Sequence, residues 1–345
     1  MGACNFSSES QDPTLPLVAS LTRSHFLFRF PIGRGGFSRV WQVRYRGCKT
    51  DFALKEMNKD RIIAKKSVNS VLRELRLLAL LRHHFIVNVL FAFQDCANLY
   101  LVLNLMPGGD LRFHMTRYKR FTEEQTKFFV ACLVVALEYL HSNGVMHRDI
   151  KPENIVLDQN GYLRLTDFGI ARATTENSGG DDSAGTPGYM APEVMCKLPH
   201  GPAADYFALG VVAYELMMGR RPYAGHSRVE VRDSILAKQV KVETKDVPSG
   251  WSPTAAAFVS SLLQRKPSNR LGYHSESEVK THPWLRDVKW DQLTAKRLPS
   301  PFCPGPGENF DRGFVTEDWK DCLSVSALSQ AAKDDLFQAY RYSVH

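Results

Sequence analysis

The pattern of the chain changes once, near residue 106, and this change limits the fold more than any other feature. Before it, short runs rich in β-branched and aromatic residues predict strands, with one helical stretch among them. The strand-like runs are Phe26–Ile32, Val40–Tyr45, Phe52–Glu56, Ile86–Phe93 and Leu99–Leu103, and the helical stretch is Ser70–Leu81. After it, helical spacing of apolar residues dominates. The pattern predicts an α+β chain with a small β-rich lobe and a large, mainly helical lobe.

Three stretches organise the second half of the chain. Thr122-Glu-Glu-Gln125 has the form of a capping box and predicts the start of a long helix. Asp205–Gly219 is almost entirely apolar, which is typical of a helix at the centre of a large core. Prolines and glycines crowd the segment after Leu298, and a helix-like end, Ala327–Tyr340, follows. We therefore expect a mobile leader (residues 1–24), a small lobe (25–105), a large lobe (106–285) and a tail (286–345).

Charge and cysteine usage narrow the partners and the compartment. The 345 residues carry 44 basic and 36 acidic side chains, a net charge of +8, which favours anionic partners. Basic and aromatic residues do not gather on one element, which argues against nucleic acid. The 7 cysteines contain no Cys-x-x-Cys pair, so no disulfide framework or zinc site is indicated. No apolar run has the roughly 20 residues of a membrane span. We expect a monomeric, cytoplasmic protein.

A glycine-rich stretch follows the first predicted strand. Gly33-Arg-Gly35-Gly36 would let backbone N–H groups approach phosphate oxygens, although simple turns also use such stretches. The strand predicted at Val40–Tyr45 argues against a dinucleotide-binding unit, in which a helix follows the glycines. Lys55 lies in an apolar strand, where Glu74 of the following helix could hold it. A snorkelling lysine and an exposed glutamate are the alternatives.

A more specific cluster begins at His147. His147-Arg-Asp149-Ile-Lys151-Pro-Glu-Asn154 combines a carboxylate, cations and an amide, and the apolar Ile155-Val-Leu after it argues against a solvated run of charges. Thirteen residues beyond Asn154 comes Asp167-Phe-Gly169. Aspartate and asparagine supply the oxygen ligands that suit Mg²⁺ bound to phosphates.

These elements, with Ala191-Pro-Glu193 after them, occur in the order found in eukaryotic protein kinases, and the chain resembles that family from about residue 25 onward. The resemblance implies the bilobed kinase fold and transfer of a phosphoryl group from ATP, with Mg²⁺, to protein substrates. Asp149 would orient and deprotonate the substrate hydroxyl, and Lys151 would support the γ-phosphate. Lys55, fixed by Glu74, would hold the α- and β-phosphates.

The resemblance also implies the residues around the nucleotide. Asn154 and Asp167 would bind Mg²⁺, Leu103 would be the gatekeeper, and the third loop glycine of the family is replaced by Ser38. The complete nucleotide set is Ile32, Gly33, Gly35, Gly36, Ser38, Val40, Ala53, Lys55, Leu103, Asn104, Met106, Asp110, Asn154 and Asp167.

Further segments resemble the AGC group of Ser/Thr kinases and, within it, the YANK branch. The AGC segments are Pro107–Leu111, His282–Trp284, Trp290–Leu293, Pro301–Pro304 and Asn309–Asp311. The segments most similar to the YANK branch are Phe52–Lys59, Gly109–His114 and Gly219–Tyr223. Lys151 and Thr186 are similar to Ser/Thr rather than tyrosine kinases, and Thr186 would lie at the substrate. Relatives in this group bind arginines before the phosphoacceptor through carboxylates, a role that falls here to Asp110, Glu153 and Glu215.

Two regulatory expectations follow from the same resemblance. Many AGC kinases carry a phosphorylated threonine where this chain has Asp182, which would gather Arg148 and Arg172 with a weaker, permanent charge. The last residues are similar to the AGC hydrophobic motif, so Phe337 and Tyr340 would insert beside the Glu74 helix. An acidic pair without effect and an amphipathic helix with incidental aromatics remain the alternatives.

The N-terminus suggests a membrane contact. Met1-Gly2 resembles an N-myristoylation start, and Cys4 offers a second acylation site, which stable anchoring requires. Phe6 departs from the motif, which has Ser or Thr there. An ordinary leader is the alternative.

Two function classes stay open on the sequence alone. The leading hypothesis is an active protein kinase, because Lys55, Asp149, Asn154 and Asp167 are all present. The alternative is a pseudokinase that binds ATP or serves as a scaffold.

Overall fold

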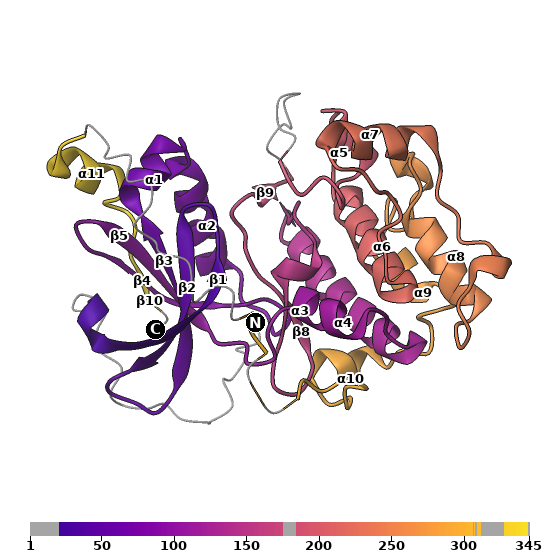
Figure 1. Ribbon diagram of the computed structural model, residues 1–345, viewed down its shortest axis with the longest axis horizontal. Helices are drawn as coiled ribbons and strands as arrows, with labels where there is room; N and C mark the ends of the chain where they lie inside the picture. Colours follow the sequence, from indigo (N-terminus) through magenta and orange to yellow (C-terminus); the bar gives the residue numbers. More distant parts are fainter. Residues whose placement is uncertain (1–20, 175–183, 306, 308, 312–327, 344–345) are drawn as a thin grey trace. The chain divides into compact units, whose positions relative to one another are not determined.

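The computed structural model describes residues 21–174, 184–305, 307, 309–311 and 328–343 (Figure 1). The chain divides into two compact units. The first unit contains the residues up to Leu75, Val89–Leu105 and the residues from Asp311 onward. The second contains Arg76–Asn88 and Met106–Phe310. The predicted tail is therefore shared, because residues 286–310 belong to the second unit and the rest to the first.

The first unit is built on a six-stranded antiparallel sheet of order β1-β2-β3-β5-β4-β10. Its strands are β1 (Phe26–Arg34), β2 (Ser38–Tyr45), β3 (Asp51–Asn58), β4 (Val89–Gln94), β5 (Asn98–Asn104) and β10 (Tyr342–Ser343). Its helices are α1 (Lys59–Ala64), α2 (Val68–Leu80), which continues into the second unit, and α11 (Gln330–Leu336), with a 3₁₀ turn at Arg23–His25. The five predicted strands and the predicted helix are confirmed, each with slightly different ends.

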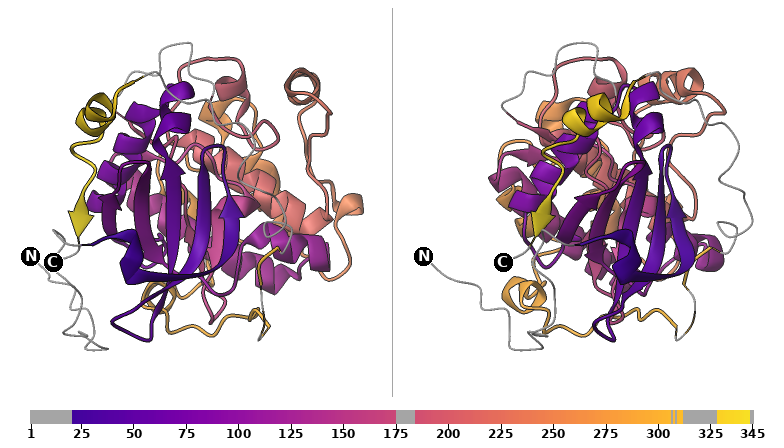
Figure 2. Two further views of the ribbon diagram at one scale, coloured as in Figure 1. Left: turned by 60° about the vertical axis from the view of Figure 1, so that its left-hand side comes forward. Right: turned by 90° about the vertical axis from the view of Figure 1, so that its left-hand side faces the viewer.

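Two expectations about the ends of the first unit are wrong. Leu21 packs into the aromatic cluster of the sheet with Phe26 and Tyr45, so residues 21–24 are part of the fold and not of a mobile leader. The helix expected over Ala327–Tyr340 is confined to α11. Beyond α11 the chain turns and adds β10 to the edge of the sheet next to β4 (Figure 2), because strand pairing supplies its backbone hydrogen bonds.

The second unit is mainly helical. Its helices are α3 (Leu111–Tyr118), α4 (Glu123–Ser142), α5 (Pro192–Met195), α6 (Ala203–Met218), α7 (Arg228–Ala237), α8 (Pro253–Leu262), α9 (Ser277–Thr281) and α10 (Trp290–Thr294). Two small antiparallel sheets carry the loops of the site. One pairs β6 (Val145–Met146) with β9 (Arg172–Ala173), and the other is the hairpin of β7 (Ile155–Leu157) and β8 (Leu163–Leu165). Short 3₁₀ turns lie at Pro152–Asn154, Thr244–Asp246 and Pro267–Asn269.

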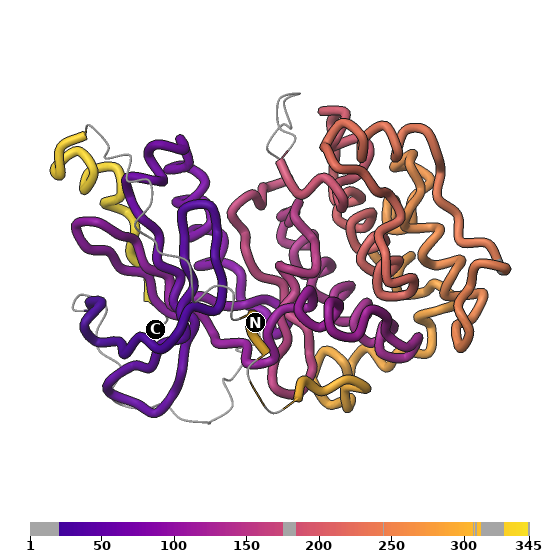
Figure 3. The backbone as a smooth tube through the Cα atoms, in the orientation of Figure 1, coloured from indigo at the N-terminus to yellow at the C-terminus, as the bar shows by residue number. Residues whose placement is uncertain are grey.

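The core of the second unit forms around α6, which is buried over nearly its whole length and packs against α4 and α8. The Thr122 capping box of α4 is confirmed, with Gln125 N–H donating to the Thr122 hydroxyl at 3.2 Å. After α10, which lies beside α4 (Figure 3), the chain inserts Phe302 between aromatic rings that include His114 and Phe129. In the described part of the chain, no helix is long and apolar enough to cross a bilayer.

Candidate active site

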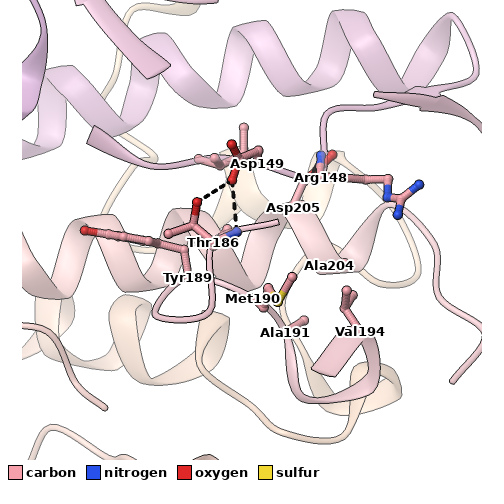
Figure 4. Close-up of a pocket in the computed structure, with 11 residues that line it drawn as sticks. Arg148, Asp149, Thr186, Tyr189, Met190, Ala191, Val194, Ala204 and Asp205 are labelled. Carbon is pink, nitrogen blue, oxygen red and sulfur yellow. Dashed lines mark hydrogen bonds between the residues drawn. The ribbon is translucent and has the colours of Figure 1, made fainter. Parts of the chain in front are cut away.

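Asp149 lies at the centre of a hydrogen-bonded group in the loop between β6 and β7. The Thr186 hydroxyl donates to Asp149 Oδ1 at 2.8 Å (Figure 4). Lys151 Nζ is 2.6 Å from Asp149 Oδ2. Lys151 Nζ also donates to Thr186 Oγ1 at 2.8 Å, and Asn154 Nδ2 lies 3.0 Å from Asp149 Oδ2. Both carboxylate oxygens are thus fixed by neighbours of the types that general acid–base chemistry uses.

Asp205 of α6 holds the backbone of the loop that precedes Asp149. Its carboxylate accepts the backbone N–H groups of His147 at 2.9 Å and Arg148 at 2.8 Å, and it bonds His141 at 2.9 Å. Burial alone would raise the pKa of Asp205, but the His141 hydrogen bond and nearby positive charge outweigh it and lower the pKa. These bonds stabilise the positive φ of 70° at Arg148, which non-glycine residues seldom adopt.

The two residues expected to bind Mg²⁺, Asn154 and Asp167, lie at the open end of the β7–β8 hairpin. Ile155 pairs with Leu165, and the Thr166 N–H donates to the Asn154 carbonyl at 3.0 Å. The backbone at Asp167, the residue after Thr166, is therefore held near the backbone at Asn154. Asp167 has a positive φ of 65° and an exposed side chain, whereas Phe168 is fully buried. One carboxylate and one amide oxygen suit an Mg²⁺ ion whose other ligands are phosphates and water. Among the described residues, no group of three or more His, Cys, Asp or Glu could hold a metal alone.

Lys55 and Glu74 form the predicted ion pair within the first unit. Lys55 Nζ of β3 lies 2.6 Å from Glu74 Oε1 of α2, and only 4% of the Glu74 side chain is exposed. Strand register places Val40 opposite Lys55 and Ala53 opposite Leu103. Because opposite residues share a face and alternate residues return to it, these four side chains lie on one face of the sheet.

The glycine-rich stretch forms the β1–β2 hairpin, and no helix follows it, as expected. Gly35 N–H donates to the Ser38 carbonyl at 2.8 Å, and the Ser38 side chain is buried at the start of β2. Lys65, after α1, donates to the Gly36 carbonyl at 2.8 Å. The sequence pattern did not indicate that Lys65 contacts the glycine-rich hairpin.

The remaining nucleotide residues divide between the two units. Ile32 is in β1, and Leu103 and Asn104 end β5, all in the first unit. Met106 and Asp110 belong to the second unit. Asp110 is the N-cap of α3, where it accepts the Phe113 N–H at 2.8 Å, and burial, which is the largest influence, raises its pKa.

The acids assigned to substrate arginines have an unexpected partner in the chain itself. Arg112 of α3 donates to Glu153 and to Glu215, each at 2.9 Å. The sequence pattern did not single out Arg112 as a partner of these acids. Its position two residues after Asp110 was the one available signal. The preference for basic peptides stays a prediction, and two of its three carboxylates are already paired.

The segment after Thr186 is fastened by a buried ion pair. Arg270, fully buried, donates to both carboxylate oxygens of Glu193 at 2.6 and 3.0 Å. Such a bidentate pair fixes geometry as well as charge. It holds the end of the segment that carries Thr186 against the core of the second unit.

The two tail aromatics lie inside the first unit. Phe337 and Tyr340 are both fully buried, and Gln94 Nε2 donates to the Phe337 carbonyl at 2.8 Å. Burial, followed by the charge of Glu74, raises the pKa of Tyr340, which places this ring near the α2 glutamate. Ion pairs from Lys59 to Asp334 at 3.1 Å and from Lys333 to Asp60 at 2.6 Å join α11 to α1.

The other regulatory residues are described only in part. Arg172 of β9 pairs with Met146 of β6, and Arg148 lies in the loop two residues after Met146. Asp182, Gly2 and Cys4 lie outside the described residues.

An antiparallel sheet with a Lys–Glu pair, together with a helical unit that presents an Asp–Lys–Asn group, defines a phosphotransferase of the kinase type. Residues 28–285 match the family model described as the protein kinase domain. The chain is similar to serine/threonine-protein kinase 32B of Homo sapiens, with 38% identity over 85% of this chain and 72% of that protein. It is 37% identical to protein kinase 2 of Dictyostelium discoideum (94% and 68% covered) and 35% identical to serine/threonine-protein kinase Sgk1 of Danio rerio (92% and 74% covered). The chain belongs to the protein kinase family, as a serine/threonine-protein kinase related to the AGC group.

Proposed function

We propose that this kinase transfers the γ-phosphoryl group of ATP to protein hydroxyls with Asp149 as the residue that receives the substrate proton. The observation that carries the proposal is the fixed Asp149 carboxylate, bonded to Lys151, Asn154 and Thr186. Lys151 places a positive charge beside the Asp149 carboxylate. This charge would stabilise the negative charge of the phosphoryl group during transfer.

We propose the following roles for the residues that the resemblance assigns to the nucleotide. Lys55, held by Glu74, would neutralise the α- and β-phosphates, and Val40, Ala53 and Leu103 offer an apolar face to the base. Mg²⁺, when bound, neutralises phosphate charge, and the Asp167 carboxylate and the Asn154 amide oxygen would hold it. The Asn154 amide nitrogen is engaged by Asp149, so its oxygen is the atom available for this role.

The alternative is a pseudokinase, and one experiment separates the two. Phosphoryl transfer from radiolabelled ATP to a generic protein substrate is measured for the wild type and for Asp149→Asn. A positioned base contributes about 10²–10⁴-fold, so the variant should lose activity by that order while it still binds nucleotide. If the wild type labels substrate no faster than Asp149→Asn, the enzymatic proposal fails and a scaffold remains.

We also propose that the protein acts as a cytoplasmic monomer that reaches membrane surfaces through acylation of Gly2 and Cys4. Support comes from the Met1-Gly2 start and from the nearby cysteine. One myristoyl chain binds only marginally, so Cys4 would be the second signal.

A further inference from the structure

Arg112 is bonded to the two acids that the AGC resemblance assigns to an arginine of the substrate. Arg112 Nε donates to Glu153 Oε1 at 2.9 Å, while its two terminal nitrogens face Glu215 at 2.9 and 3.3 Å. The guanidinium also donates to the Tyr189 hydroxyl, and Tyr189 donates to Glu215. All five donors of an arginine are suited to such a forked arrangement.

The arrangement is partly withdrawn from solvent. Glu215 is 9% exposed and Arg112 is 31% exposed, whereas Glu153 at 46% forms the outer edge. Burial would lower the pKa of Arg112, but its hydrogen bond to Glu215 and the surrounding negative charge raise the pKa instead. Both charges of the Arg112–Glu215 pair are therefore satisfied within the protein.

The position of Arg112 is fixed by the start of α3. Asp110 caps the helix, and Leu111, which is fully buried, anchors its first turn. The guanidinium is thus tethered beside the acids at a high effective concentration. An arginine of a bound peptide would have to displace a partner that is covalently part of the same chain.

We propose that Arg112 is a specificity-determining residue that occupies the Glu153–Glu215 pair, so that this kinase gains little from a substrate arginine at the position the pair would serve. The inference rests on the proposed kinase function. Its substrates are Ser/Thr peptides for which any arginine preference comes from Asp110. Replacing Arg112 by a neutral residue opens a site for a substrate arginine.

A merely structural role for Arg112 makes a different prediction. If Arg112 only tied α3 to α6, its loss would lower stability and slow all peptides equally. A selectivity role changes the ratio between peptides that differ in one arginine, whatever the absolute rate.

The test measures kcat/KM for a neutral serine peptide and for versions with one arginine at each preceding position in turn. For the wild type, we expect the ratio of kcat/KM with the arginine to kcat/KM without it to be near one at every position except one that depends on Asp110. Arg112→Leu should raise the ratio about tenfold at a new position, and Arg112→Leu combined with Glu153→Gln should lose much of that gain. Arg117→Leu, which removes an exposed arginine from the same helix, should leave all ratios unchanged.

The same peptides, fluorescently labelled, are tested for binding to Asp149→Asn protein by anisotropy with and without Arg112→Leu. This measurement decides the inference even if no peptide is phosphorylated, an outcome that would contradict only the kinase proposal. Glu153→Gln in the otherwise wild-type protein provides a second test, because residue 153 lies at the exposed outer edge of the group. If Glu153→Gln alone reduces an arginine preference, or if Arg112→Leu leaves every ratio and affinity unchanged, the proposal is overturned.

Discussion

Tyr340, near the end of the chain, is fully buried close to Glu74, the glutamate that holds Lys55. The end of the tail therefore lies close to the glutamate that positions the phosphate-binding lysine. Because Tyr340 and Glu74 both belong to the first unit, we expect the buried tail to support the Lys55–Glu74 pair.

Truncation after Lys333 should lower activity and thermal stability together. It removes the fully buried Phe337 and Tyr340 and the strand β10, and the loss of one buried phenylalanine alone costs about 3–5 kcal/mol. We expect Tm to fall by several degrees and kcat/KM by several-fold. Phe337→Ala should reproduce most of both losses, and Gln338→Ala, at an exposed neighbour, should reproduce neither. Unchanged Tm and activity in the truncated protein would contradict the role of the tail.

The Tyr340 hydroxyl gives a sharper test of the same contact. This buried oxygen has no hydrogen-bond partner among the described residues, and an unpaired buried hydroxyl costs about 1–3 kcal/mol. Tyr340→Phe should therefore keep or raise Tm, whereas Tyr340→Ala should lower it. Thermal denaturation of the three proteins checks this, and a lower Tm for Tyr340→Phe would show that the hydroxyl is bonded in solution.

Local sequence patterns were sufficient for the residues around Asp149. His147, Asn154 and Asp167 lie in short loops between strands that follow one another in the chain, so spacing in the sequence carries much of their geometry. The strands of the first unit were likewise predictable, because each shows its own run of β-forming residues.

Long-range pairing explains what the sequence could not predict. Arg112 meets Glu215 across 103 residues, and the buried Lys59 pairs with Asp334, 275 residues away. The Ala327–Tyr340 helix was too long for a related reason. Burial of Phe337 and Tyr340, with pairing of β10 to β4, outweighs the helical preference of that stretch.

The N-terminal hypothesis predicts that Gly2→Ala moves the protein from the membrane fraction to the soluble fraction. Myristoylation requires the glycine, and a single remaining acyl signal gives only marginal, reversible binding. Cys4→Ser should cause a similar shift, because the one myristoyl chain that remains also binds only marginally. Fractionation of cells expressing the three proteins measures this, and an unchanged membrane share for Gly2→Ala would end the hypothesis.

The loop hypothesis predicts that phosphatase-treated protein keeps most of its activity. Arg172 lies in β9 opposite Met146, Arg148 follows two residues after Met146, and Asp182 would supply both arginines with a permanent negative charge. Asp182→Asn should reduce kcat several-fold, and Asp181→Asn, at the neighbouring acid, should reduce it less. Phosphorylation at Thr174, Thr175, Ser178 or Ser183 is the rival explanation. Loss of activity on dephosphorylation, with full activity in Asp182→Asn, would support that rival.

Thr186 links the catalytic carboxylate to Lys151, and its removal should slow the chemical step. Its hydroxyl donates to Asp149 Oδ1 and accepts from Lys151 Nζ, both at 2.8 Å. A hydrogen bond to a charged group contributes about 1.5–3 kcal/mol, so Thr186→Val should lower kcat by about tenfold or more. Thr186→Ser retains the hydroxyl and should retain most of kcat. Steady-state kinetics with varied ATP should show KM for ATP nearly unchanged, since Thr186 bonds the base and its lysine. Full kcat in Thr186→Val would mean that Lys151 and Asn154 hold Asp149 without it.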